Sequence, residues 1–402
     1  MLELAEQGPV RRPRTAVVVS GGGARGAYQV GVLRGLIDAG FLPAEGPAFD
    51  IFVGSSAGAI NAAALASHAD NLAKGVEALE RVWGGIQPQQ VFRTDLRSLG
   101  STGFQWAWDL SFGGALGHVT PKALLDTSPL RQLLKEKIPL RRLDANIANG
   151  TLHALAVAAT DLYTSNGVVF VHGAPEVSLW KRARWVVERA RIGVDHLMAS
   201  SAIPIFFPSV EVGERHFGDG CIRNTAPLSP AINLGAERIV AIGVLEGARV
   251  AVPAVSGRRL PPTIAQIAGI LLDAVMLDAI EVDVEHSTRV NSSVLRSTAP
   301  TPGFPFRLVD VLWLSPRQSL GQLAMDYAEK IPGIVRYLMR GLGSDETTTE
   351  LVSYLLFDAT YCSRLMELAR EDVVAARPAI EQFFSSAAPQ RNRQAVADGA
   401  VQ

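Results

Sequence analysis

Residues 49–66 read FDIFV-GSSAG-AINAAALA: an apolar run, a Gly-x-Ser-x-Gly pentapeptide and a helix-forming run. This order predicts a β-strand, a tight turn and an α-helix, with Ser56 in a sharp strand-to-helix elbow. Such an elbow holds the serine hydroxyl clear of its own backbone, and the nearby helix N-terminus favours negative charge. The stretch therefore indicates a nucleophilic Ser56 in an acyl hydrolase. A turn of small residues is the alternative, because glycine is frequent here, at 37 of 402 residues.

A glycine-rich turn lies upstream of the elbow, at Gly21-Gly22-Gly23-Ala24-Arg25-Gly26. It follows a strand expected at residues 15–20 and precedes a helical pattern, so its backbone N–H groups can hold an anion. The glycine spacing fits a dinucleotide-binding fingerprint, for which Asp50 lies roughly where a ribose-binding acid would fall. The alternative is an oxyanion hole for an acyl-transfer intermediate. The elbow downstream, with Asp50 on the strand that leads into it, favours the oxyanion hole.

A serine nucleophile needs a base, most often a histidine held by a carboxylate. The chain has seven histidines, none in a segment typical of that role: His68, His118, His153, His172, His196, His216 and His286. A carboxylate is the better candidate. Asp219 lies in Phe217-Gly218-Asp219-Gly220-Cys221, where the two glycines allow a sharp turn and the close approach of another segment. An ordinary Asp-Gly hairpin turn is the alternative.

Together the three motifs resemble those of the patatin-like phospholipases, over roughly residues 14–245 of this chain. Members of that family carry a glycine-rich motif with Arg or Lys before its last glycine, a Gly-x-Ser-x-Gly elbow and a downstream Asp-Gly-Gly or Asp-Gly-Ala motif. Residues 21–26, 54–58 and 219–221 match these. The stretches ASSAIPIFFP at 199–208 and NTAPL at 224–228 are also similar. The chain departs from the family at Cys221, but cysteine is small and mostly apolar, so we expect the turn to persist.

The resemblance implies a three-layer α/β/α fold with a mainly parallel sheet, and a Ser56–Asp219 dyad without histidine. Asp219 would accept the serine proton and later activate water, which requires partial desolvation to raise its pKa. The oxyanion hole would lie in Gly21, Gly22, Gly23 and Ala24, chiefly at the N–H groups of Gly22 and Gly23. Losing one such donor typically costs on the order of 3–4 kcal/mol.

Further residues would support these motifs: Arg25, Gly26, Gly54, Gly58 and Gly220. For Arg25 two roles stay open, pairing with a substrate phosphate or bracing the loop. The resemblance implies no metal and no cofactor.

The bulk composition fits a lipid-directed enzyme. The net charge is −1, with 38 basic and 39 acidic residues, so the chain as a whole lacks the basic footprint of a nucleic-acid-binding protein. Two cysteines form neither a disulfide framework nor a zinc signature. Neither a signal-peptide core nor an apolar stretch of about 18 residues is evident. We expect a cytoplasmic protein with reversible contact at a membrane surface; its oligomeric state is left open.

The chain divides by composition into several regions. Residues 1–14 are expected to be a tail and 15–250 the catalytic domain, because strands and helices alternate there. Within it, the glycine-rich and aromatic segment 84–120 is either a lid or acyl-entrance segment, or aromatic packing on the core. Residues 251–262 are expected to be a linker, 263–384 a mostly helical region with one strand near 308–314, and 385–402 a disordered tail.

Three functions are consistent with these motifs. The first is a lipid acyl hydrolase of the phospholipase A or lysophospholipase type, a serine-dependent carboxylic ester hydrolase whose partner is a lipid ester. The second is an acyltransferase on the same dyad, although the related carrier-protein transacylases usually have histidine where Ser55 stands. The third is a non-enzymatic module that binds lipid or nucleotide, against which the presence of both Ser56 and Asp219 argues.

Overall fold

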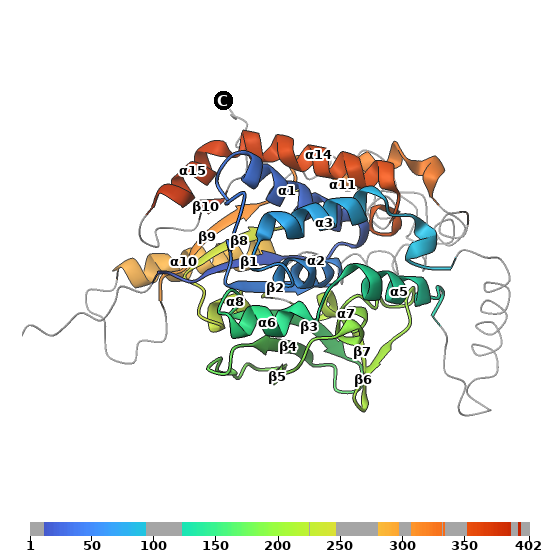
Figure 1. Cartoon of the computed structure of the whole chain (residues 1–402), viewed down its shortest axis with the longest axis horizontal. Coiled ribbons are helices and arrows are strands. Elements are labelled where there is room, and N and C mark those ends of the chain that lie inside the picture. The colour runs from blue at the N-terminus through green and yellow to red at the C-terminus, as the bar shows by residue number, and fades with distance from the viewer. Residues whose placement is uncertain are drawn as a thin grey trace, which may run out of the picture.

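One large sheet forms the centre of the molecule (Figure 1). The computed structural model describes residues 12–93, 123–224, 226–246, 280–296, 307–331, 333, 352–386 and 393–394. The strands lie in the order β10-β9-β8-β1-β2-β3-β4-β5, and a hairpin of β6 and β7 joins through β7 to β3. Their bounds are β1 (Thr15–Val19), β2 (Ile51–Ser55), β3 (Ala154–Asp161), β4 (Gly167–Gly173), β5 (Trp185–Arg189), β6 (Val210–Val212), β7 (Arg215–Asp219), β8 (Arg238–Ile242), β9 (Asp310–Leu314) and β10 (Arg393–Gln394).

The sheet is mainly parallel: of the described pairs, β3–β4, β3–β7 and β6–β7 are antiparallel and the others are parallel. Helices cover both faces, so the expected α/β fold with a mainly parallel sheet is confirmed. The helix bounds are α1 (Gly26–Asp38), α2 (Ala57–Ala66), α3 (Leu72–Gly84), α5 (Ser128–Lys137), α6 (Arg142–Ala148), α7 (Val194–Ser200), α8 (Ser229–Asn233), α10 (Ile280–Arg296), α11 (Leu320–Met325), α14 (Ala359–Ala375) and α15 (Arg377–Ser385).

Two apolar cores lie on opposite faces of the sheet. Side chains of a strand alternate between its faces; accordingly Val17 and Val19 of β1 belong to the larger core, and Ala16 and Val18 to the smaller. The larger core is packed by helices that include α1, α2, α3, α5, α7 and α14, and the smaller by α8 and α10. The result is three layers, with the carboxyl ends of β1 and β2 leading into the two glycine-containing turns.

The C-terminal region belongs to the same sheet and core. Strand β9, near the expected position 308–314, pairs in parallel with β8. Helix α14 packs along α1, where the buried hydroxyl of Tyr28 donates to Asp372 Oδ2 at 2.8 Å. The region is mostly helical, as predicted. The described residues after 280 are nevertheless integrated with residues 15–246, which the expectation of a linker-separated region did not anticipate; the linker at 251–262 lies outside the described residues.

Two further predicted segments are described only in part. In the predicted segment 84–120, residues 84–93 are described; there Phe92 is buried and contacts the rings of Phe207 and Phe357, and the other aromatic residues lie outside the described part. In the predicted tail 385–402, Ser385 ends α15 and Arg393–Gln394 forms β10 beside β9. For those residues the structure differs from a disordered tail, because the exposed edge of β9 offers backbone partners.

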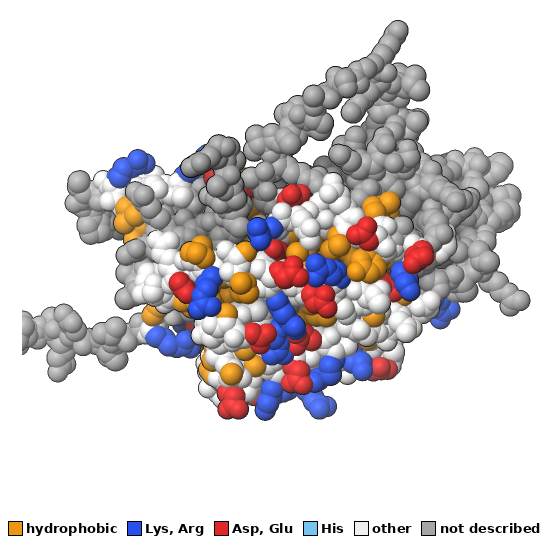
Figure 2. Space-filling model, turned by 90° about the horizontal axis from the view of Figure 1, so that it is seen from above, with side chains coloured by type: hydrophobic (Ala, Val, Ile, Leu, Met, Phe, Trp, Pro, Cys, Tyr) orange, Lys and Arg blue, Asp and Glu red, His pale blue; other side chains and the backbone are white. Residues whose placement is uncertain are grey.

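The face above α14 carries basic and acidic side chains interspersed with one another, as Figure 2 shows. Ion pairs join Arg364 to Glu371 within α14 and Arg370 of α14 to Glu80 of α3. Exposed pairs of this kind contribute little stability, so packing of the cores holds these helices in place. In the part of the chain that the structure describes, no helix is both long enough and apolar enough to cross a membrane.

Candidate active site

Ser56 occupies a sharp turn between β2 and α2, as the motif predicted. Its φ is 52° and its ψ −130°, a backbone conformation that is uncommon for a residue with a side chain and that clusters at functional sites. The turn requires glycine on both sides, because neighbouring backbone atoms leave no room for a side chain. A Cβ on Gly58 would lie 2.3 Å from the carbonyl oxygen of Ser20, and a Cβ on Gly54 would lie 2.3 Å from the carbonyl oxygen of Gly58.

Asp219 ends strand β7 and lies directly beside Ser56. Its carboxylate Oδ2 accepts a hydrogen bond from Ser56 Oγ at 2.7 Å, and its Oδ1 accepts one from the backbone N–H of Cys221 at 2.8 Å. The backbone is fixed as well, since the Asp219 N–H donates to Ala202 O and the Asp219 carbonyl accepts from Thr160 Oγ1, both at 2.9 Å. Gly220 follows without a side chain because a Cβ there would lie 2.3 Å from Ala158 O.

The environment of Asp219 makes its carboxylate a stronger base. The side chain is fully buried, and this burial raises its pKa from 3.8 to about 6, against the opposing effect of hydrogen bonds from Ser56 and Cys221. Burial has this sign because removal from water disfavours the charged form. A carboxylate with a pKa near 6 is ionised at neutral pH and still accepts a proton more readily than an exposed aspartate.

The glycine-rich loop lies next to both Ser56 and Cys221, since a Cβ on Gly21 would lie 2.2 Å from Cys221 Sγ. It joins β1 to a short 3₁₀ turn, η1 (Gly23–Arg25), which leads into α1 at Gly26. A Cβ on Gly21 would lie 3.0 Å from Ser56 Cβ, so this loop and the elbow are in contact. Gly23 has φ +54°, and a Cβ there would lie 2.1 Å from the carbonyl oxygen of Tyr354. Residues 21–25 thus lead, beside the serine, into the N-terminus of α1, where N–H dipoles favour negative charge.

Asp50 lies near the start of β1, at the opposite end of that strand from this loop. Its carboxylate accepts hydrogen bonds from the Thr15 N–H at 2.8 Å and from Arg12 at 2.6 Å. Thr15 begins β1, whereas the glycine-rich loop follows Val19 at the other end of the strand. The geometry therefore does not fit the dinucleotide-binding interpretation of the loop.

The Arg25 side chain is buried inside the protein. It is 1% exposed; its Nε donates to Ser353 Oγ at 2.7 Å, and its guanidinium lies 4.4 Å from the centroid of the Tyr354 ring. Of the two roles left open by the sequence, this geometry fits bracing of the loop and does not fit contact with a substrate phosphate.

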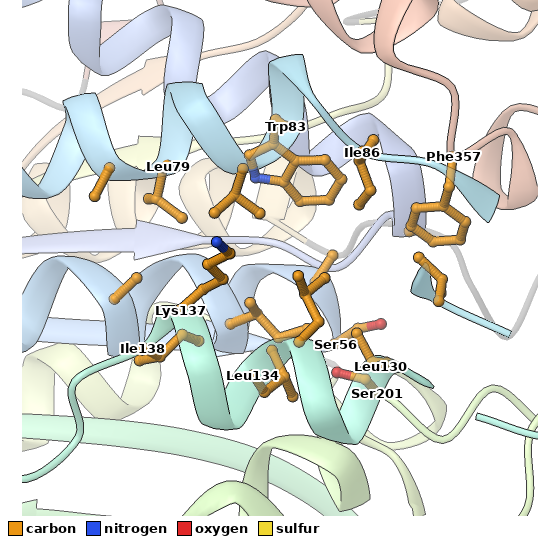
Figure 3. Close-up of a pocket in the computed structure, with 18 of the residues that line it drawn as sticks. Ser56, Leu79, Trp83, Ile86, Leu130, Leu134, Lys137, Ile138, Ser201 and Phe357 are labelled. Atoms are coloured by element: carbon orange, nitrogen blue, oxygen red, sulfur yellow. The ribbon is translucent and has the colours of Figure 1, made fainter. Parts of the chain in front are cut away.

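An apolar groove extends from Ser56 between α2, α3 and α5 (Figure 3). Its cavity volume is about 60 Å³, so the groove is narrow. Ser56, Leu130 and Phe357 are grouped at one end, and Leu79, Lys137 and Ile138 lie toward the other. The walls are formed almost entirely by aliphatic and aromatic side chains, which suits a hydrocarbon chain.

Two features of the site were not singled out in the sequence. Ser200 Oγ accepts a hydrogen bond from the Ser56 N–H at 3.0 Å and donates to Ala158 O at 2.5 Å, so it links the backbone of the elbow to β3. Its only signal was its place in the family-like stretch 199–208. Residues 353–357, which contact the loop and the groove, gave no signal, because their contacts depend on the packing of a distant segment.

Described histidines have partners other than Ser56; His153 lies near Glu176 and His216 near Ser209. His68 Nδ1 contacts Ala64 O, His172 contacts Asp144, and His196 Nδ1 accepts from the Gly193 N–H. His118 lies outside the described residues. In the described part of the chain, no group of three or more His, Cys, Asp or Glu side chains is arranged to hold a metal ion.

A family model, patatin-like phospholipase, matches residues 17–232. The chain belongs to this family. Membership supports lipid hydrolysis as the general activity of this patatin-like phospholipase, and the matched range contains both Ser56 and Asp219.

Comparisons with individual proteins add less. Among solved structures, VipD from Legionella pneumophila is 12% identical with a TM-score of 0.31, covering 92% of this chain and 77% of that one. The ExoU–SpcU complex from the type III secretion system of Pseudomonas aeruginosa gives 17% identity and a TM-score of 0.28, covering 90% and 52%. The search of curated proteins found no match.

Proposed function

We propose that this chain is a serine-dependent carboxylic ester hydrolase of the phospholipase A or lysophospholipase type, in which Ser56 and Asp219 form a catalytic dyad. The observation that carries the proposal is the 2.7 Å hydrogen bond from Ser56 Oγ to a fully buried carboxylate. A nucleophile in direct contact with its base, on a strained strand-to-helix turn, is the arrangement that covalent acyl transfer requires.

In the first half of the proposed reaction, Ser56 Oγ attacks the ester carbonyl carbon while its proton passes to Asp219 Oδ2. The resulting oxyanion accepts hydrogen bonds from the N–H groups of the loop, chiefly those of Gly22 and Gly23. The C–O bond to the alcohol then breaks, the alcohol takes the proton from Asp219, and the acyl group stays esterified to Ser56.

In the second half, Asp219 takes a proton from water and the hydroxide attacks the acyl-serine carbonyl. Collapse of this intermediate breaks the bond to Ser56 Oγ, returns the proton to the serine and releases the fatty acid. Because the carboxylate is ionised at neutral pH yet has a pKa of about 6, it can act as base and then as acid in both halves. The apolar groove would hold the acyl chain during both.

The test compares the wild-type chain with Ser56→Ala and with Ser55→Ala, its neighbour in the turn. The expected result is that Ser56→Ala abolishes both labelling by a fluorophosphonate and release of fatty acid from phospholipid, lysophospholipid and neutral-lipid substrates, whereas Ser55→Ala is still labelled. Circular dichroism would verify that both variants fold. Undiminished labelling of folded Ser56→Ala would remove Ser56 from the mechanism, and product analysis would separate hydrolysis from transfer to an added alcohol.

A further inference from the structure

The groove beside Ser56 has polar groups at its two ends and an apolar wall between them. Figure 3 shows the hydroxyl groups of Ser56 and Ser201 at one end, and Lys137 toward the other. His68 also lines the wall. It lies beyond the last residue of α2, twelve positions after Ser56.

The groove runs parallel to the axis of α2. Ser56, Ile60, Ala64 and His68 line it at four-residue intervals, the spacing of one helical face. Helix α3 runs antiparallel to α2, since Trp83 near its end donates to Asn61 at 3.0 Å, while a Cβ on Gly75 would lie 3.0 Å from His68 Cβ. Leu130 and Leu134 of α5, and Ile138 directly after it, repeat the same interval. The lining residues of the three helices therefore form three roughly parallel rows, and these rows enclose one straight path.

Ser201 marks the end of the path where an ester group fits. Its side chain is buried, and no described group lies within hydrogen-bonding distance of its Oγ. A buried hydroxyl without a partner is unfavourable, and a polar atom of a ligand or a water in the groove would satisfy it. The ester oxygen of a substrate bound at Ser56 would lie at the same end.

The length of the path limits the length of the chain that it can hold. The ten residues of α2 span about 15 Å, and His68 extends this to roughly 18 Å. An extended chain of single bonds advances about 1.2 Å per bond, so this path accommodates roughly 12–15 bonds.

We infer that the groove binds one extended acyl chain of about 13–16 carbons, with its carbonyl at Ser56 and its methyl end near Lys137 and His68. This inference rests on the proposed function, because the chain must begin at the acylated serine. Ala64 and Ala78 line the distal part of the groove; their small side chains leave room for the chain, so they determine chain-length specificity. Each methylene of the chain that is buried against the apolar wall of the groove raises kcat/KM by up to about fourfold. This gain in kcat/KM ends where the wall becomes polar.

The test measures kcat/KM for octanoyl, lauroyl, palmitoyl and behenoyl p-nitrophenyl esters in mixed micelles. The wild-type chain should favour palmitoyl over octanoyl and lose the advantage with behenoyl. Ala78→Leu narrows the distal groove and should lower the palmitoyl-to-octanoyl ratio at least tenfold. Ala73→Leu, a half-buried alanine on the same helix that does not line the groove, should leave the ratio at its wild-type value.

A second pair of variants tests the polar limit. Lys137→Met replaces an ammonium at the distal end with an apolar side chain and should shift the optimum toward longer chains, whereas Lys135→Met on the same helix should not. A wild-type profile without a maximum, or identical profiles for Ala78→Leu and Ala73→Leu, would overturn the inference while leaving the hydrolase intact. Absence of cleavage of every ester would instead contradict the proposed function.

Discussion

Ser56 Oγ donates a hydrogen bond to Asp219 Oδ2 at 2.7 Å, although the two residues are 163 positions apart in the chain. Strand β3 brings them together, because β2 pairs with its residues 154–158 and β7 with its residues 159–161 along the same edge, opposite β4. The strands that carry Ser56 and Asp219 are thus both hydrogen-bonded to β3. This arrangement gives the pair a defined geometry and places the carboxylate out of contact with water, and both properties lead to measurable consequences.

The first consequence is a pH dependence of the reaction. Asp219 must be ionised to accept the serine proton, and its pKa is raised by burial to about 6. We expect kcat/KM for a soluble ester to fall about tenfold for each pH unit below 6 and to level off above it. The measurement is a pH–rate profile of the wild-type chain over the pH range in which the chain stays folded. A flat profile down to pH 5 would contradict Asp219 as the base.

The second consequence concerns stability. Because the folded-state pKa lies above the ordinary value of 3.8, the protonated carboxyl favours the folded state below pH 3.8, and that contribution is lost as pH rises through 6. At pH 8 the buried charge costs up to roughly 3 kcal/mol. Asp219→Asn is always neutral, so it should unfold at a higher temperature than wild type at pH 8 and at a similar temperature near pH 4.

The same Asp219→Asn variant should lose activity by about 10²–10⁴-fold. Glu211→Gln, at an exposed position of the hairpin of β6 and β7, serves as a control that should change neither the activity nor the unfolding temperature at pH 8. A loss of activity without any gain in stability at pH 8 would show that the carboxylate is not desolvated in solution.

Ser200 gives a prediction about the elbow itself. Its Oγ accepts from the Ser56 N–H at 3.0 Å, and in Ser200→Ala that buried donor has lost its acceptor. The expected cost is about 1–3 kcal/mol in the free energy of unfolding, with a lower kcat because the turn that positions Ser56 Oγ is less well held. Chemical denaturation and ester kinetics measure both. If neither changed, the hydrogen bond would have no part in positioning the serine.

Much of the site could be predicted from sequence because its motifs are local. Gly54 and Gly58 are required by backbone approaches of 2.3 Å within and next to the turn, so a short pattern encodes the elbow. The order of strands and helices before residue 83 likewise follows from short-range periodicity. The position of Asp219 beside Ser56 came from the family resemblance, since no local signal relates β7 to β2.

The contribution of the C-terminal half could not be predicted in this way. Tyr354 touches Gly23 and Arg25 only because α14 packs on α1 and β9 extends the sheet. These contacts join residues more than 300 positions apart, as in the hydrogen bond from Arg25 to Ser353. The linker predicted near residue 250 lies outside the described residues, but the described strands before and after it belong to one sheet.

This long-range contact carries the last prediction. The buried Arg25 guanidinium donates to Ser353 Oγ at 2.7 Å and stacks on Tyr354, and Arg25 belongs to the loop that would hold the oxyanion. Ser353→Ala removes an acceptor from a buried charge, at a cost of about 1.5–3 kcal/mol, which the loop can relieve by moving. Because an oxyanion hole acts in the transition state, we expect kcat to fall about tenfold or more while KM changes little. Ser363→Ala, a half-buried serine on α14, should leave both constants unchanged. If Ser353→Ala lowered only thermal stability and left kcat at the wild-type value, residues 353–354 would support the fold without positioning the loop.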